Sequence, residues 1–127
     1  MGLISSEVIR RYKNPSKKGN CDDTGLHIAR AAGDNALCGD SVCMEFAVEG
    51  EGADARIVQA RFEGNGCSLC IAAADALAEA SEGATVQSVL ALDFDGVCEA
   101  LGGIQVSRSR RECVELPIRA LRSALDR

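Results

Sequence analysis

Seven cysteines carry the clearest chemistry in this 127-residue chain, and Cys67 has the most informative position among them. The stretch Gly64-Asn65-Gly66-Cys67 joins a strand-like pattern to an alanine-rich helical pattern. Glycine adopts backbone angles that other residues resist, so the chain can turn sharply here. A thiol at the start of a helix lies in a positive field that favours the thiolate, the form that binds metal or attacks sulfur. Any site in this chain is therefore expected to include Cys67.

Cys38 and Cys113 have comparable positions, one before the first expected strand and the other near the start of the last expected helix. Asp40 follows Cys38 by two residues. A loop and two helix starts can converge at one end of a small domain that contains both helices and strands. Three thiolates and a carboxylate suit a tetrahedral Zn²⁺ ion or an iron–sulfur cluster. The cysteines are far apart in sequence, so their spacing alone leaves open whether they share a site.

Cys70 has two interpretations. Cys67-x-x-Cys70 fits a thiol redox pair, because residues three apart on a helix lie on one face. Alternatively, Cys70 is a small residue that packs in the core. Cys43 and Cys98 are expected to be packing residues, and Cys21 a loop thiol.

Length and composition favour one domain, residues 1–127, with an apolar content of 46% that can form one core. Residues 1–20 lack the apolar run of a signal peptide, and no stretch approaches the roughly 20 apolar residues that span a bilayer. We therefore expect a cytoplasmic protein without a membrane partner, in which clustered cysteines serve metal or sulfur chemistry rather than disulfides. The net charge of -5 argues against nucleic acid as a partner.

The charges are unevenly distributed along the chain. Residues 21–104 hold three basic residues against fifteen acidic ones, so the other eleven basic residues lie in the two ends. If the ends pack side by side, they form a basic patch on an acidic body. Such a patch is either a solvated surface or a docking surface for an acidic protein.

Hydrophobic periodicity predicts the elements that must position these residues. A helix is expected over residues 4–12, followed by a long polar loop over 14–37 with a short helical turn near His27–Arg30. Alternation over residues 42–48 and 58–62 predicts an antiparallel hairpin. The lone His27 is expected to be solvated.

Helices follow the hairpin. One is expected from Cys67 to about Ala80, and two short ones after the capping residues Thr85 and Asp93. The last helix is expected to start near Cys113, because Pro117 is tolerated only in a first turn.

Four motifs in this order resemble the U-type iron–sulfur scaffold family, which includes IscU, SufU and the N-terminal domain of NifU. The resemblance extends from about residue 4 to the end of the chain. The motifs are Tyr12-Lys13-Asn14-Pro15, Cys38-Gly39-Asp40, Phe62-Glu63-Gly64-Asn65-Gly66-Cys67 and Arg110-Arg111-Glu112-Cys113.

The resemblance implies an α+β fold like that of SufE and IscU, with about three antiparallel strands packed against four to five helices. It implies a metal and cluster site made of Cys38, Asp40, Cys67 and Cys113. It also implies a scaffold that takes persulfide sulfur from a cysteine desulfurase, holds a transient [2Fe–2S] cluster or Zn²⁺, and serves apo client or carrier proteins. In such a protein the desulfurase breaks the carbon–sulfur bond, so we expect this chain to be a scaffold and sulfur acceptor rather than a turnover enzyme.

Departures from the family pattern leave the branch open. Glu112 stands where IscU-like members have histidine and many SufU-like members have lysine, and it is either a rim charge or a substitute ligand. The chaperone-docking motif of IscU and the insertion typical of SufU are both absent. The alternatives are a thiol redox or sulfur-transfer enzyme that uses Cys67 and Cys70, or a small domain with a purely structural zinc.

Cys113 is the expected sulfur acceptor. It follows the polar segment Gln105–Glu112, which could let it swing toward an incoming persulfide. Arg108, Arg110 and Arg111 precede it and would favour its thiolate.

Overall fold

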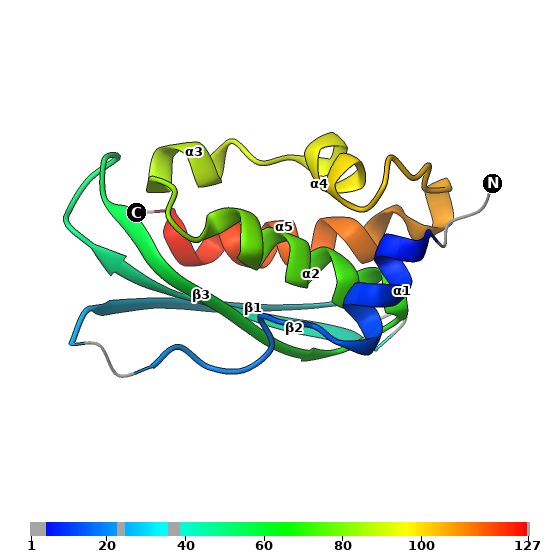
Figure 1. Ribbon diagram of the computed structural model, residues 1–127, viewed down its shortest axis with the longest axis horizontal. Helices are drawn as coiled ribbons and strands as arrows, with labels where there is room; N and C mark the ends of the chain where they lie inside the picture. Colours follow the sequence, from blue (N-terminus) through cyan, green and yellow to red (C-terminus); the bar gives the residue numbers. More distant parts are fainter. Residues whose placement is uncertain (1–4, 23–24, 36–38, 127) are drawn as a thin grey trace.

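The computed structural model describes residues 5–22, 25–35 and 39–126, and places a layer of helices on one face of a three-stranded sheet (Figure 1). The sheet is antiparallel with the order β1-β2-β3. The architecture confirms the expected α+β class. The strands are β1 (His27–Asn35), β2 (Asp40–Glu49) and β3 (Arg56–Asn65), and the helices are α1 (Ser6–Lys13), α2 (Ser68–Ser81), α3 (Val86–Leu90), α4 (Phe94–Ala100), the 3-10 turn η1 (Arg108–Arg110) and α5 (Arg111–Leu125).

The predicted hairpin is confirmed as β2 and β3. Val42, Met44, Phe46 and Val48 are buried on the helix-covered face, and Met44 pairs with Phe62 across the two strands. The register shifts between Ala47 and Val48, which places one extra residue in β3. Because the two strands are antiparallel, the start of β2 lies beside the end of β3.

The prediction of a loop with a helical turn near His27 is wrong, because residues 27–35 form strand β1. Alanine and glycine give this strand little local preference for extended structure, and its pairing with β2 and its cover by α5 decide the outcome. A Cβ at Gly33 would lie 3.2 Å from Leu116 Cδ1. The small residues therefore let α5 pack closely on β1.

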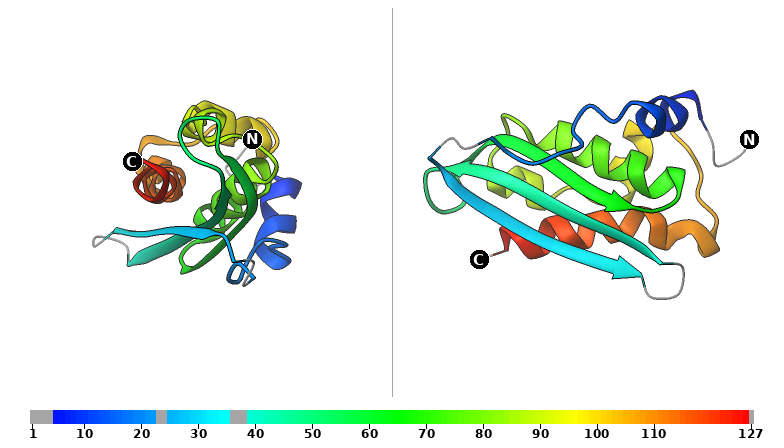
Figure 2. Two further views of the ribbon diagram at one scale, coloured as in Figure 1. Left: turned by 90° about the vertical axis from the view of Figure 1, so that its left-hand side faces the viewer. Right: turned by 90° about the horizontal axis from the view of Figure 1, so that it is seen from below.

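Helix α2 lies at the centre of the helical layer and confirms the predicted alanine-rich helix. Every residue from Leu69 to Ala78 is buried, whereas Ala80, expected on the apolar face, is exposed. The helices α1 and α5 lie on opposite sides of α2 (Figure 2). Among the described residues, the two terminal helices that carry basic side chains are therefore separated by α2.

The predicted caps are confirmed, since Thr85 accepts a hydrogen bond from Ser88 N and Asp93 accepts one from Gly96 N. The last helix differs from the prediction, because it starts at Arg111, directly after η1, and contains Pro117 in its interior. Proline has no N–H, so the carbonyl of Cys113 lacks its usual i+4 helical partner.

Among the described residues, no helix is both long and apolar enough to cross a membrane.

Candidate metal centre

Three of the four predicted ligands meet at one end of the sheet. A carboxylate oxygen of Asp40 and the Sγ atoms of Cys67 and Cys113 all lie within 4.8 Å of one another. Cys67 Sγ and Cys113 Sγ lie 3.2 Å apart, within hydrogen-bond distance. Cys38 lies outside the described residues, in the connection between the paired residues Asn35 and Asp40.

Asp40 is placed by the sheet. It is the first residue of β2, and the next residue, Ser41, pairs with Asn65 at the end of β3. The pairing therefore holds Asp40 beside the turn that leads to Cys67. Its side chain is buried, with 8% of the residue exposed, so the carboxylate faces the cluster rather than open solvent.

Cys67 is the N-cap residue of α2 and is half-buried. The two glycines before it serve close approach rather than unusual backbone angles, because neither has a positive φ. A Cβ at Gly64 would lie 2.3 Å from Ser41 O, inside the backbone of β2. A Cβ at Gly66 would lie 3.1 Å from Asp40 Cγ and 3.3 Å from Cys70 Sγ. Glycine at both positions thus lets β3 and α2 bring Cys67 against β2.

Cys113 is the third residue of α5 and is also buried, with 8% of the residue exposed. Burial and, to a smaller extent, the hydrogen bond with Cys67 raise the pKa of its thiol to about 11, although the guanidinium of Arg110 opposes both. Arg110 acts in the expected direction and favours the thiolate, but burial outweighs it in the metal-free protein.

Of the three arginines, Arg110 is the one that acts on the thiols of Cys113 and Cys67. Hydrogen bonds to Cys113 and Cys67 raise the pKa of Arg110, so its guanidinium lies against both thiols. Arg111 instead stacks over the ring of Phe94, at 4.0 Å from its centroid, and pairs with Glu115. Arg108 is exposed. Sequence order placed all three near Cys113, whereas the η1 turn decides which one faces it.

The remaining candidate residues lie around the site or away from it. Glu112 forms an ion pair with Arg119, in agreement with a rim charge. Cys70 is fully buried behind Gly66, as a packing residue would be. Cys98 is buried and Cys43 is half-buried. Burial, with Glu45 nearby, raises the pKa of the Cys21 thiol to about 11.

The donor set fits a zinc or iron site. Thiolates with a carboxylate suit zinc, and iron–sulfur clusters are held mainly by thiolates. A tetrahedral ion with metal–sulfur bonds of about 2.3 Å requires ligand atoms roughly 3.8 Å apart. The 3.2 Å between the two sulfurs and the limit of 4.8 Å for the set bracket that spacing. Small side-chain movements would therefore complete the coordination.

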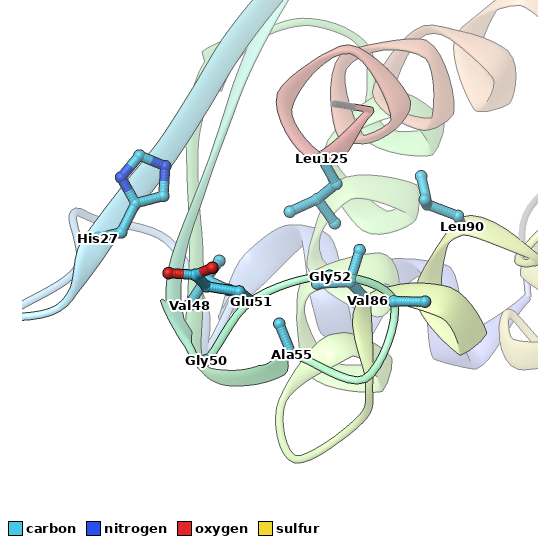
Figure 3. A pocket seen from close by; sticks show the side chains of 10 residues that line it. His27, Val48, Gly50, Glu51, Gly52, Ala55, Val86, Leu90 and Leu125 are labelled. Atoms are coloured by element: carbon cyan, nitrogen blue, oxygen red, sulfur yellow. The ribbon is translucent and has the colours of Figure 1, made fainter.

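Cavities lie both beside the ligand cluster and far from it. A cleft of about 460 Å³ adjoins the ligand cluster. The sequence did not predict this cleft, although the motif Tyr12-Lys13-Asn14-Pro15 contributes three of its lining residues. It is lined by Tyr12, Lys13, Pro15, Lys18, Gly64, Asn65, Gly66 and Ile71. A larger cavity of about 580 Å³ lies at the opposite end of the strands, where Val86, Leu90 and Leu125 gather beside the hairpin turn (Figure 3). His27 at its rim is exposed, as expected.

Comparison with protein families gives one match that covers almost the whole chain. The family described as "NifU-like N terminal domain" matches residues 3–127. The iron–sulfur cluster assembly scaffold protein IscU 1 of Archaeoglobus fulgidus is 30% identical over 124 residues, which cover 97% of this chain and 74% of that protein. The zinc-dependent sulfurtransferase SufU of Bacillus subtilis is 27% identical over 135 residues, which cover 94% of this chain and 86% of SufU.

Solved structures share the fold. A putative iron–sulfur cluster assembly scaffold protein for the SUF system from Fervidobacterium islandicum superposes with a TM-score of 0.76 and 24% identity, over 98% of this chain and 97% of that one. The N-terminal part of a nitrogen-fixing NifU-like protein from Brucella abortus gives a TM-score of 0.74 and 15% identity, over 97% of this chain and 92% of that one.

Proposed function

The chain belongs to the family of NifU-like N-terminal domains, and we propose that it is a scaffold for iron–sulfur cluster assembly. In this role it accepts persulfide sulfur from a cysteine desulfurase and holds a nascent [2Fe–2S] cluster or a zinc ion. Cys38, Asp40, Cys67 and Cys113 hold the metal. Apo iron–sulfur proteins or carriers then receive the cluster.

One observation carries the proposal. Two sulfurs and a carboxylate oxygen from three distant parts of the chain lie within 4.8 Å of one another, with Asp40 and Cys113 buried. A buried carboxylate is unfavourable without a compensating partner, and a metal ion held together with the two sulfurs supplies that partner. Carboxylate is a harder and more exchangeable ligand than thiolate, which suits a site that must release its cargo more than a purely structural zinc.

The sulfur acceptor in this proposal is Cys113. Its support is the contact with Arg110, whose charge favours the thiolate that burial disfavours. The protein supplies ligands and the accepting thiol, while the desulfurase breaks the carbon–sulfur bond. In this scheme the chain is a scaffold and acceptor rather than a turnover enzyme.

A second candidate function is zinc-dependent sulfur transfer. The relative from Bacillus subtilis that carries this name covers 94% of this chain. The same ligands would then hold zinc, and the thiol relay would be the activity. The two candidates differ in the metal that they require.

Metal analysis of protein purified and reconstituted without oxygen tests the proposal. We expect either iron with an equal amount of acid-labile sulfide or zinc, bound by the unaltered chain. Substitution of Cys38, Cys67 or Cys113 by serine should remove most of it, because alcohol oxygen is a poor replacement for thiolate. Asp40→Ala should retain metal but exchange it faster. The matched control is Cys43→Ser, which changes a half-buried thiol outside the ligand set. Equal metal content in the control and in all three ligand variants would refute the site.

A further inference from the structure

We propose that Cys67 is the internal reductant of the site: it attacks the inner sulfur of a persulfide on Cys113, expels hydrosulfide and closes a Cys67–Cys113 disulfide. This step rests on the proposed function, because it requires a persulfide on Cys113. It adds to that function a source for the two electrons that turn persulfide sulfur into sulfide.

The distance between the two sulfurs carries the inference. Cys67 Sγ lies 3.2 Å from Cys113 Sγ, already at contact. In a persulfide on Cys113, that same Sγ atom becomes the inner sulfur of the Sγ–Sδ bond. Cys67 therefore faces the atom that it must attack before any sulfur arrives. Reacting atoms held about 3–3.5 Å apart have most of the entropic cost of encounter removed.

The chemistry balances without an outside reductant. The Cys67 thiolate forms a bond to Cys113 Sγ as the bond from Sγ to the outer sulfur breaks. The outer sulfur leaves with the electron pair of the broken bond and its proton, as hydrosulfide. It is reduced, and the two cysteine sulfurs are oxidised to a disulfide. Such exchange proceeds by thiolate attack on a sulfur–sulfur bond.

Between the two described thiols at the start of α2, the surroundings favour Cys67 over Cys70. Cys67 is half-buried at the N-cap of α2, and its side chain makes no capping hydrogen bond to the helix. Cys70, one turn later, is fully buried and its Sγ lies against Gly66. Full burial leaves Cys70 less accessible to an incoming sulfur donor than the half-buried Cys67.

The product defines the reaction that must follow. A Cys67–Cys113 disulfide removes two of the ligands from the cluster, so a dithiol reductant has to restore both thiols before the site binds metal again. Sulfide release and metal binding would thus alternate at the same pair of sulfur atoms. The reaction class that completes the cycle is dithiol–disulfide exchange.

The test uses metal-free, reduced full-length protein under nitrogen, with glutathione persulfide as the sulfur donor. Excess donor is removed by rapid desalting, the sulfide that the protein then releases is followed with time, and the cysteines are mapped by mass spectrometry. We expect one equivalent of sulfide per chain and a disulfide that joins Cys67 to Cys113. Cys67→Ser should keep the persulfide on Cys113 and release sulfide at least about 100-fold more slowly, because an intramolecular attack has been removed. Cys43→Ser should behave as the unaltered chain.

Each other result overturns a defined part of the scheme. A stable persulfide on Cys113 with Cys67 intact, equal sulfide release from Cys67→Ser, or a disulfide between Cys67 and Cys70 would overturn this step alone. Absence of persulfide from Cys113 in Cys67→Ser would overturn both this step and the proposed acceptor. The disulfide map of the unaltered chain does not depend on how well any variant folds. Protein incubated without the donor must keep all its thiols, which excludes oxidation by residual oxygen.

Discussion

Arg110 decides, at the scale of single residues, how reactive the buried thiol of Cys113 is. Burial and the Cys67 thiol raise the pKa of Cys113 to about 11, and Arg110 is the cation that opposes them. The pKa of a thiol depends on which charged groups contact its sulfur, not on how many charged residues lie near it in the sequence. Arg111, adjacent to Arg110, is engaged by Phe94 and Glu115.

Removal of Arg110 should therefore make Cys113 less reactive. We expect alkylation of Cys113 by iodoacetamide in metal-free protein to rise with pH toward about 11, since only the thiolate reacts. In Arg110→Gln the pKa of Cys113 should rise further, so the rate at any pH below that value should fall, by roughly tenfold per unit of additional shift. Peptide mapping after timed alkylation measures this. The matched control is Arg108→Gln, an exposed arginine two residues away, which should leave the rate unchanged. Faster alkylation in Arg110→Gln would contradict the assigned role.

At the scale of elements, a buried ion pair holds α1 against α2. Asp75, in the middle of α2 and 1% exposed, accepts hydrogen bonds from Arg11 Nη1 at 2.7 Å and from the backbone N of Lys17 at 2.9 Å. One carboxylate thus fixes both the helix and the segment that follows it. That segment pairs with Phe62 of β3 and forms part of the cleft beside the metal centre.

Asp75→Asn should destabilise this attachment. The substitution removes the one fully buried carboxylate that pairs with Arg11, whereas Glu7 and Glu79 still pair with it. The loss of unfolding free energy should therefore stay below the roughly 3–5 kcal/mol that an uncompensated buried charge costs. Chemical denaturation measures the loss, and hydrogen exchange should show faster exchange in α1 than in the sheet. Arg10→Gln is the control, because the exposed pair of Arg10 with Glu7 lies on the same helix and is screened by solvent, so its loss should have little effect. If the two substitutions lowered the unfolding free energy equally, the buried Arg11–Asp75 pair would stabilise the fold no more than the exposed Arg10–Glu7 pair does.

At the scale of the whole molecule, the candidate ligands connect parts of the chain that are far apart in sequence. Asp40 begins β2, Cys67 caps α2 and Cys113 lies in the first turn of α5. A metal bound by all three would tie the sheet to both helices. A ligand that binds only the folded state adds to the free energy of unfolding.

Metal should therefore raise thermal stability, and a chelator should lower it. At a free zinc concentration about 1,000 times the dissociation constant, the gain in unfolding free energy is about 4 kcal/mol, which corresponds to roughly 10 °C or more in Tm. Differential scanning calorimetry with zinc and with EDTA measures the difference. Cys67→Ser should lose most of the shift, while Cys98→Ser, a buried thiol outside the cluster, should keep it. If zinc raised Tm equally in both variants, the stabilising ion would be bound elsewhere.

Much of the framework follows from local sequence. Alternation of apolar residues predicted β2 and β3, because a half-buried strand requires a period of two. Thr85 and Asp93 predicted two helix starts, because a side-chain oxygen there satisfies an otherwise unpaired N–H. The order of the cysteine motifs identified Cys67 and Cys113 as candidates for one site, and the structure places their sulfurs in contact.

Other features arise only from contacts between distant segments. The local sequence of β1 does not predict a strand, because alanine and glycine have little preference for extended structure. These small residues instead allow the close approach of α5. The η1 turn adds helix before Cys113, directs Arg110 to the sulfurs and leaves Pro117 inside α5. The protonation of Cys113 is likewise tertiary, since burial depends on what covers the thiol and not on which charges precede it. Sequence determined which side chains are available for sulfur and metal chemistry, whereas tertiary packing decided which of them meet and in what electrostatic environment.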